Sequence, residues 1–180
     1  MKRAKKRARR PAAVSAPESG LLARQVGEAL KAQGMTLVTA ESCTGGGVAQ
    51  AVTRISGSSD WFDRGFVTYS NESKEEMLGV SPETLEQYGA VSEQTVREMV
   101  DGALQYSRAQ IALSVSGIAG PTGGTPEKPV GTVWFAWGTN KSVHAVCHHL
   151  PGDRDAVRAK SVQIALQGVI NLLNGITKIA

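Results

Sequence analysis

Long apolar runs and paired metal-binding cysteines are both missing from this 180-residue chain. No stretch approaches the length of a membrane-spanning helix, and the basic N-terminus lacks the apolar segment of a secretory signal. The two cysteines, Cys43 and Cys147, lie in unrelated contexts without CxxC spacing, which argues against a zinc site or a disulfide framework. We therefore expect a cytoplasmic protein with no metal site and no contact with a membrane.

Basic charge is scarce in most of the chain, although the total suggests otherwise. The sequence has 20 Lys and Arg against 16 Asp and Glu, but seven of the basic residues lie within residues 1–10. The other 13 leave residues 11–180 with a net charge of −3. We interpret residues 1–17 as a disordered basic tail and residues 18–180 as one globular domain. The tail could contact RNA or an anionic surface, although a solvated tail is more common.

Hydrophobic periodicity predicts helices that alternate with short apolar strands. The predicted strands are 35–40, 65–70, 111–115, 130–138 and 142–150. The predicted helices are one from Leu22 to a stop at Gly34, 48–55, 71–78, one from Ser81, 92–106, and one from Gly152 to Leu173. This order predicts an α/β fold, a three-layer α/β/α sandwich with a mixed central sheet whose final strands are antiparallel.

A polar turn at residues 39–48, TAESCTGGGV, joins a buried-strand pattern to a helix pattern. Its glycines allow a sharp turn and let a ligand approach the main chain, while the N–H groups of the new helix would point at that ligand. These features outline an anion or oxyanion site beside Ser42. Alternatively, Ser42 or Thr44 is only a helix cap, and the turn alone does not decide between the two.

A second glycine-rich loop follows the predicted strand 111–115. Residues 117–126, GIAGPTGGTP, are costly to order, which favours a binding loop over a flexible surface excursion, although both stay open. Further on, Arg154 and Arg158 are four residues apart at the start of the last helix and can face one direction together. They could hold a phosphate, or they could pair with neighbouring aspartates.

A serine nucleophile needs a base, and two kinds are available. His144, His148 and His149 cluster on one predicted strand, so a serine-histidine pair requires that strand to reach Ser42. Lys74, at the start of a short helix just beyond Tyr69, is the other candidate. A lysine can act as a base only if burial or a nearby positive charge lowers its pKa, and a lysine considered alone is more often a solvated surface charge.

Five segments closely resemble the CinA C-terminal domain family, also called the nicotinamide mononucleotide deamidase or PncC family. They are TAESCTGGGVAQAV, GFVTYSNESKEEMLGV, YGAVSEQTVREM, SVSGIAGPTGGTPEKPVGTVW and GDRDAVR. The resemblance covers about Gly20 to Leu173, with the motifs in order. The larger CinA proteins carry an additional N-terminal domain, so this chain resembles the stand-alone amidase form.

The resemblance implies hydrolysis of nicotinamide mononucleotide to nicotinic acid mononucleotide and ammonia, a step in pyridine nucleotide recycling. It implies no cofactor and favours a homodimer. Carried over residue by residue, it makes Ser42 the nucleophile, Lys74 its general base and Tyr69 a third polar partner that relays a proton or fixes Lys74.

The chemistry of the two glycine-rich segments suggests the remaining site residues. Our candidates for the oxyanion site are the backbone N–H groups of Thr44, Gly45 and Gly46. Our candidates for the phosphate site are Gly120, Thr122, Gly123, Gly124, Thr125 and Arg154. Two other functions stay open: a nucleotide-binding module without turnover, which the glycine-rich loops would also suit, and an RNA-associated protein that acts through its basic tail.

Overall fold

One mixed β-sheet forms the centre of the computed structural model, which describes residues 18–175, so the predicted basic tail at 1–17 lies outside the described residues. Five strands follow the order β2-β1-β3-β4-β5. They are β1 (Leu37–Glu41), β2 (Phe62–Val67), β3 (Ile111–Gly117), β4 (Thr132–Gly138) and β5 (Val143–His149). Strand β1 pairs in parallel with both β2 and β3, whereas β3, β4 and β5 pair antiparallel.

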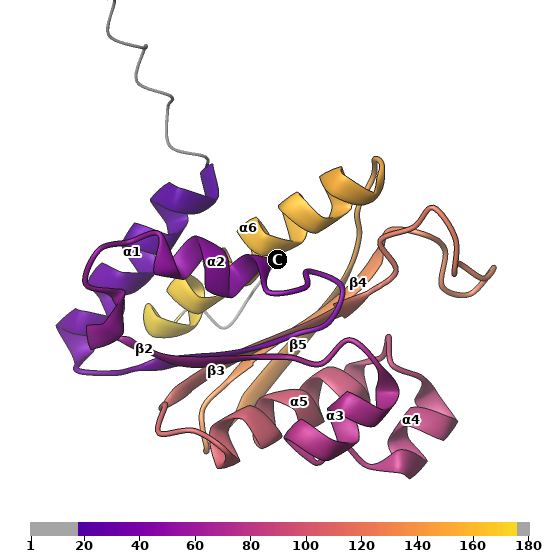
Figure 1. The fold of residues 1–180 in the computed structure, drawn as a ribbon, viewed down its shortest axis with the longest axis horizontal. Helices are drawn as coiled ribbons and strands as arrows, with labels where there is room; N and C mark the ends of the chain where they lie inside the picture. Colours follow the sequence, from indigo (N-terminus) through magenta and orange to yellow (C-terminus); the bar gives the residue numbers. More distant parts are fainter. Residues whose placement is uncertain (1–17, 176–180) are drawn as a thin grey trace, which may run out of the picture.

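Helices cover both faces of the sheet (Figure 1). The helices are α1 (Glu18–Gln33), α2 (Gly47–Thr53), α3 (Asn71–Leu78), α4 (Pro82–Tyr88), α5 (Glu93–Gln105) and α6 (Arg154–Leu173), with a 3₁₀ turn at Ser58–Asp60. Helices α1, α2 and α6 pack together on one face, and α3 and α4 pack against α5 on the other. This arrangement confirms the predicted three-layer α/β/α sandwich with a mixed sheet and antiparallel final strands.

The core consists of two apolar clusters, one on each side of the sheet. Alternate residues of β1 point to opposite faces, so Leu37 joins the cluster under α1 and α6 while Val38 joins the cluster under α5. Every residue of β1 is buried, as expected for a central strand covered on both faces. The site at the end of β1 is therefore held on a rigid, fully packed strand.

The second strand and the helix after the Ser42 turn differ from their predicted bounds. Strand β2 begins three residues earlier than predicted and ends at Val67 instead of residue 70. As an edge strand it exposes polar residues such as Asp63 and Arg64, which hid its start from a search for apolar alternation. Helix α2 ends at Thr53, two residues before its predicted end at residue 55.

No helix within residues 18–175 is long and apolar enough to cross a membrane.

Candidate active site

Ser42 lies directly after β1, at the end of the central parallel pair of strands. Its backbone N–H donates to the carbonyl of Val115 on β3 at 2.9 Å, and the residue is 8% exposed. Gly45 and Gly46 then take φ values of 60° and 91°, a left-handed conformation that glycine adopts without strain. The predicted strand-turn-helix arrangement around Ser42 is confirmed.

Glu41, the residue before Ser42, is a fully buried carboxylate that fixes the turn from inside. It accepts hydrogen bonds from the Thr44 hydroxyl at 2.6 Å and from the N–H groups of Val48 and Ala49 at 3.0 Å and 2.8 Å. A carboxylate at a helix N-terminus is favourable because it satisfies the free amides and the helix dipole. The expectation that the first N–H groups of α2 face a ligand is therefore wrong for Val48 and Ala49.

Lys74 lies on α3 and reaches Ser42 from the face of the sheet opposite α2 and α6. Helix α3 begins with a capping box in which Ser70 and Ser73 exchange side-chain and backbone hydrogen bonds, so Lys74 falls in its first turn. The Lys74 Nζ atom lies 3.1 Å from Ser42 Oγ, 2.7 Å from the Thr68 carbonyl and 3.4 Å from the Ser70 carbonyl. The structure thus pairs the predicted nucleophile with the predicted base.

Burial changes the acidity of the two groups beside Ser42 in opposite directions. Lys74 is only 1% exposed, and its desolvation lowers the pKa of the ammonium from 10.5 to about 8. Desolvation raises the pKa of the Cys43 thiol to about 11, so this thiol stays protonated at neutral pH. Lys74 is therefore suited to proton transfer, whereas Cys43 is a small buried neighbour.

A pocket of about 230 Å³ opens above Ser42 and Lys74, and we call it the Ser42 pocket. It is lined by Ser42, Cys43, Tyr69, Lys74, Ala90, Val91, Ser116, Gly117, Ala119 and Arg154.

Tyr69 lies in the wall of the Ser42 pocket, where it is bonded to Arg154. The Tyr69 hydroxyl accepts a hydrogen bond from Arg154 Nη2 at 2.8 Å, and Arg154 Nη1 donates to the Gly120 carbonyl at 2.8 Å. Tyr69 is 60% exposed. No hydrogen bond joins Tyr69 to Lys74 in the part of the chain that the structure describes, so Lys74 is fixed by backbone carbonyls instead.

The three predicted oxyanion donors differ in whether their N–H groups are already hydrogen-bonded. The Gly45 N–H donates to the Ser42 carbonyl at 3.0 Å within the turn, so Gly45 is not available for an oxyanion. Gly46 is the N-cap of α2. Thr44 is buried, and its N–H makes no hydrogen bond to any residue in 18–175. Because buried amides are nearly always paired, the Thr44 N–H is the best candidate of the three for a ligand contact.

The second glycine-rich loop contributes less to the pocket than predicted. Gly120 meets Arg154 through its carbonyl, but Thr122, Gly123, Gly124 and Thr125 are exposed and do not line the Ser42 pocket. The Thr125 hydroxyl accepts the Lys128 N–H within the loop. Binding by these four residues thus requires a ligand that extends out of the pocket.

Arg154 and Arg158 do not act as the neighbouring pair that their spacing allows. Arg158 donates from Nε to the Cys43 carbonyl and from Nη2 to the Thr44 carbonyl, both at 3.2 Å, while Arg154 faces Tyr69. Asp153 caps α6 through the Ala156 N–H. The alternative of ion pairs with the adjacent aspartates is therefore not found among the described side chains.

The three histidines lie on β5, the strand at the far edge of the sheet. Strands β3 and β4 separate them from β1, so the alternative of a serine-histidine pair is excluded by the topology.

Two supporting residues, Glu41 and Arg158, went unrecognised in these roles in the sequence. Glu41 gave a usable signal, because a carboxylate at the end of an apolar strand and before a glycine turn suits a buried helix cap. The contact of Arg158 with the turn gave none, because 114 residues separate it from Thr44.

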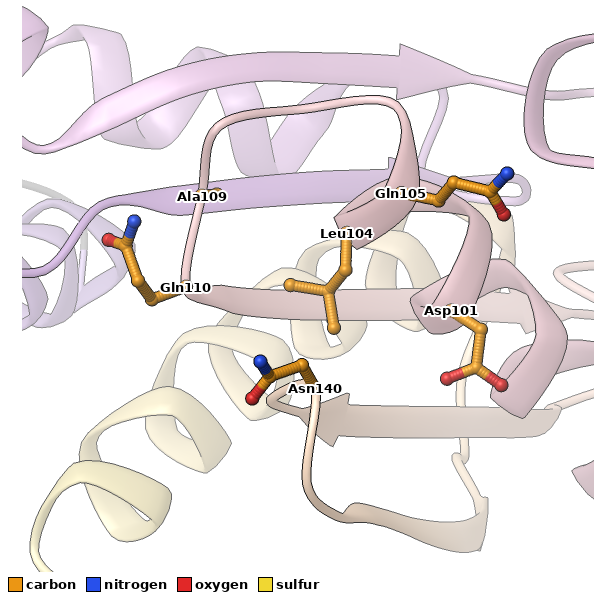
Figure 2. Close-up of a pocket in the computed structure, with 6 residues that line it drawn as sticks. All are labelled: Asp101, Leu104, Gln105, Ala109, Gln110 and Asn140. Atoms are coloured by element: carbon orange, nitrogen blue, oxygen red, sulfur yellow. The ribbon is translucent and has the colours of Figure 1, made fainter.

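A larger pocket, of about 480 Å³, lies at the opposite end of the sheet, and we call it the Asp101 pocket. Figure 2 shows Asp101, Leu104 and Gln105 near the end of α5, and Asn140 in the turn after β4. Burial and the charge of Glu98 raise the pKa of the Asp101 carboxyl. This pocket holds none of the predicted site residues.

Comparison with protein families matches residues 20–173 of the chain to the CinA C-terminal domain. The nicotinamide-nucleotide amidohydrolase PncC of Escherichia coli K12 is 60% identical over 147 residues, which cover 81% of this chain and 89% of that protein. The protein of the same description from Pseudomonas putida is 51% identical over 151 residues, covering 84% and 94%.

Two solved structures have the same fold as this chain. The competence/damage inducible protein CihA from Agrobacterium tumefaciens has a TM-score of 0.83 at 44% identity, covering 90% of this chain and 99% of that one. A CinA superfamily protein from Klebsiella pneumoniae has a TM-score of 0.84 at 41% identity, covering 87% and 98%. The fold and its match extend over nearly the whole described chain.

Proposed function

The chain belongs to the CinA C-terminal domain family, and from this premise we propose that it is a nicotinamide-nucleotide amidohydrolase. It would convert nicotinamide mononucleotide to nicotinic acid mononucleotide and ammonia, a reaction that serves pyridine nucleotide recycling. The description of its PncC relatives supports this substrate. The observation that carries the chemistry is the buried Lys74 amine 3.1 Å from the Ser42 hydroxyl.

In the first half of the reaction, neutral Lys74 takes the proton of the Ser42 hydroxyl and Ser42 Oγ attacks the carboxamide carbon. The negative charge that develops on the carboxamide oxygen would be stabilised by the buried Thr44 N–H, with Gly46 as a further candidate. Collapse of the tetrahedral intermediate breaks the C–N bond. Lys74 returns its proton to the leaving nitrogen, which departs as ammonia and leaves an ester on Ser42.

The second half repeats these roles with water. Lys74 takes a proton from the water, the hydroxide attacks the ester carbon, and the proton returns to Ser42 Oγ as the acid is released. The pyridinium ring of the substrate carries a positive charge, which would disfavour the charged form of a neighbouring lysine. Substrate binding would therefore help to keep Lys74 neutral.

The size of the Ser42 pocket suggests how the nucleotide is oriented. At about 230 Å³ it is smaller than the roughly 300–1,000 Å³ of pockets that enclose a whole drug-sized ligand. The pyridinium carboxamide would enter it, while the ribose and phosphate extend past Tyr69 and Arg154. The Arg154 guanidinium can bind a phosphate in a bidentate manner, and the exposed residues Thr122–Thr125 would contribute hydroxyls and amides outside the pocket.

Tyr69 has two possible roles in this scheme. Its bond to Arg154 supports a role in holding the phosphate-binding guanidinium. The relay of a proton to or from Lys74 would require Tyr69 to reorient when substrate binds.

The test is an assay of the purified protein with nicotinamide mononucleotide that measures ammonia and nicotinic acid mononucleotide together. We expect the two products in equal amounts, with the same rate in the presence of a chelator. Binding of the mononucleotide without ammonia at any pH would contradict the proposal and favour a binding module. A strongly salt-dependent association with RNA that disappears when residues 1–17 are removed would favour the RNA-associated function.

A further inference from the structure

Arg158 makes two adjacent hydrogen bonds to the backbone of the turn after Ser42. Its Nε and Nη2 atoms donate to the carbonyls of Cys43 and Thr44, each at 3.2 Å. The guanidinium presents these donors in one rigid plane, so it can fix two consecutive peptide groups at once. A lysine ammonium is a point charge on a flexible stem and could not hold both with the same geometry.

These bonds determine where the Thr44 N–H points. In a planar trans peptide the C=O and N–H bonds face opposite directions, so the Cys43 carbonyl and the Thr44 N–H are oriented together. Because that carbonyl faces Arg158 on α6, the Thr44 N–H points away from α6. Lys74 comes from α3, on the opposite face of the sheet (Figure 1), and its Nζ bonds to Ser42 Oγ. The Thr44 N–H therefore points away from α6 and from the pocket that Thr44 and Arg158 line on that side.

Two further contacts keep the turn in this orientation. Glu41 accepts a hydrogen bond from the Thr44 hydroxyl at 2.6 Å, so it holds the side chain of Thr44 while Arg158 holds the carbonyl. Gly45 leaves room for the guanidinium, because a Cβ atom at this position would lie 3.3 Å from Arg158 Nη2. The turn is thus held by a buried carboxylate and by a guanidinium, while the N–H between the two bonded carbonyls has no partner in residues 18–175.

We propose that Arg158 is a positioning residue that aims the Thr44 N–H at the oxyanion formed on the Ser42-bound substrate. The inference rests on the proposed amidase function. Arg158 touches neither Ser42 Oγ nor the substrate directly; it acts through the peptide between Cys43 and Thr44. Its positive charge also polarises this peptide, which makes the N–H of the buried Thr44 a stronger donor.

The first test compares turnover in Arg158→Ala, Arg158→Lys and Arg54→Ala. Removing an oxyanion donor costs about 10²–10³ in kcat, so a misaimed donor in Arg158→Ala should lower kcat by about 10–100-fold. KM should change by less than about twofold, because the oxyanion exists only in the transition state. Arg158→Lys should fall between Arg158→Ala and wild type.

Arg54→Ala is the matched control. Arg54 and Arg158 line the same pocket of about 360 Å³ behind the turn, on the side away from Lys74, and no side-chain hydrogen bond of Arg54 to the turn occurs among the described residues. Its removal tests the loss of one positive charge there without the loss of the bonds. We expect wild-type kcat and KM, and a kcat loss equal to that of Arg158→Ala would overturn the positioning role.

Chemical rescue separates positioning from simple damage to the fold. In Arg158→Ala the missing group leaves a space that joins this pocket, through which a free guanidinium ion can enter. Guanidinium chloride far below denaturing concentrations should restore kcat severalfold in Arg158→Ala, but not in wild type or Arg54→Ala. Sodium chloride at equal ionic strength should have no such effect. A kcat loss that guanidinium does not restore in folded Arg158→Ala would overturn the proposal.

A measurement without substrate makes the inference independent of turnover. The amide resonance of Thr44 in ¹⁵N-labelled protein should move in Arg158→Ala and stay in place in Arg54→Ala. If wild type releases no ammonia, the proposed function fails, but the Thr44 resonance still reports on the orientation of the peptide. An unchanged Thr44 resonance in folded Arg158→Ala would overturn the inference even if the protein is an amidase.

Discussion

The two ends of the sheet carry two very different pockets. The Asp101 pocket, where β3 begins, is about twice as large as the Ser42 pocket, which lies where β1 and β3 end. The larger pocket is lined by an aspartate, three amide side chains and the apolar side chains of Leu104 and Ala109 (Figure 2). The smaller one contains a buried lysine bonded to a serine, with an arginine and a tyrosine in its wall.

The difference favours the smaller pocket for the proposed chemistry, because perturbed titratable groups indicate a functional site better than the size of a cavity does. In the Ser42 pocket, burial brings the pKa of Lys74 to about 8, close to the pH at which a base must work. In the Asp101 pocket burial likewise shifts a pKa, here raising that of the Asp101 carboxyl. No serine, threonine or cysteine lines that pocket beside it. The following predictions test this contrast, from the largest expected effect to the smallest.

Replacing Lys74 by methionine should have the largest effect. Lys74→Met keeps the length of the buried side chain and removes the base, so kcat/KM should fall by about 10³-fold or more. Ammonia release by the purified variant measures this, and circular dichroism verifies the fold. Retention of more than a tenth of the wild-type rate would mean that another group deprotonates Ser42.

The pH profile should report the Lys74 ammonium. Its folded-state pKa is lowered to about 8, so below this pH the ammonium predominates and cannot accept the Ser42 proton. We expect kcat/KM of the free enzyme to fall about tenfold for each pH unit below the pKa and to level off above it. A profile that is flat through pH 8 would contradict the assignment of Lys74 as base.

Removing the Arg154 guanidinium should weaken binding of a phosphorylated substrate. A charge-assisted hydrogen bond contributes about 1.5–3 kcal/mol, so Arg154→Ala should raise KM for nicotinamide mononucleotide by about 10–100-fold. The corresponding riboside, which lacks the phosphate, provides the control and should show less than about a threefold change. Equal losses for both substrates would indicate that Arg154 acts on the reacting end of the molecule.

The smallest effect is expected at the Asp101 pocket. Asp101→Asn removes the only charged side chain that lines this pocket and keeps the shape of that side chain. Asp101 lies at the far end of the sheet from Ser42. We expect kcat and KM within about twofold of wild type, because ionic effects over such separations are screened. A tenfold loss would show that the two ends are coupled and would break the comparison.

The layers and most elements followed from local sequence signals. Gly34 marked the end of α1, and the predicted helices 71–78 and 92–106 agree with α3 and α5 within one residue. Exposed polar residues hid the start of β2, because an edge strand need not alternate between apolar and polar residues.

The site was only partly readable from the sequence. The turn that carries Ser42 had a clear pattern, but Lys74 is 32 residues away and reaches it only because α3 packs beneath the sheet. The sequence therefore left Lys74 and the histidines open as bases until the family resemblance favoured Lys74. The contacts of Arg158 depend on packing between distant segments, so no local pattern predicted them. The partners of Glu41 lie only three to eight residues away, within reach of a local pattern.

The central claim, that Ser42 attacks the carboxamide, is tested most directly by comparing wild type and Ser42→Ala in one assay. Binding of nicotinamide mononucleotide by calorimetry and release of ammonia should be measured on the same preparations. The account predicts that Ser42→Ala binds the mononucleotide with an affinity within a few-fold of wild type and releases ammonia about 10³-fold more slowly or not at all. Ammonia release by Ser42→Ala at the wild-type rate would contradict it.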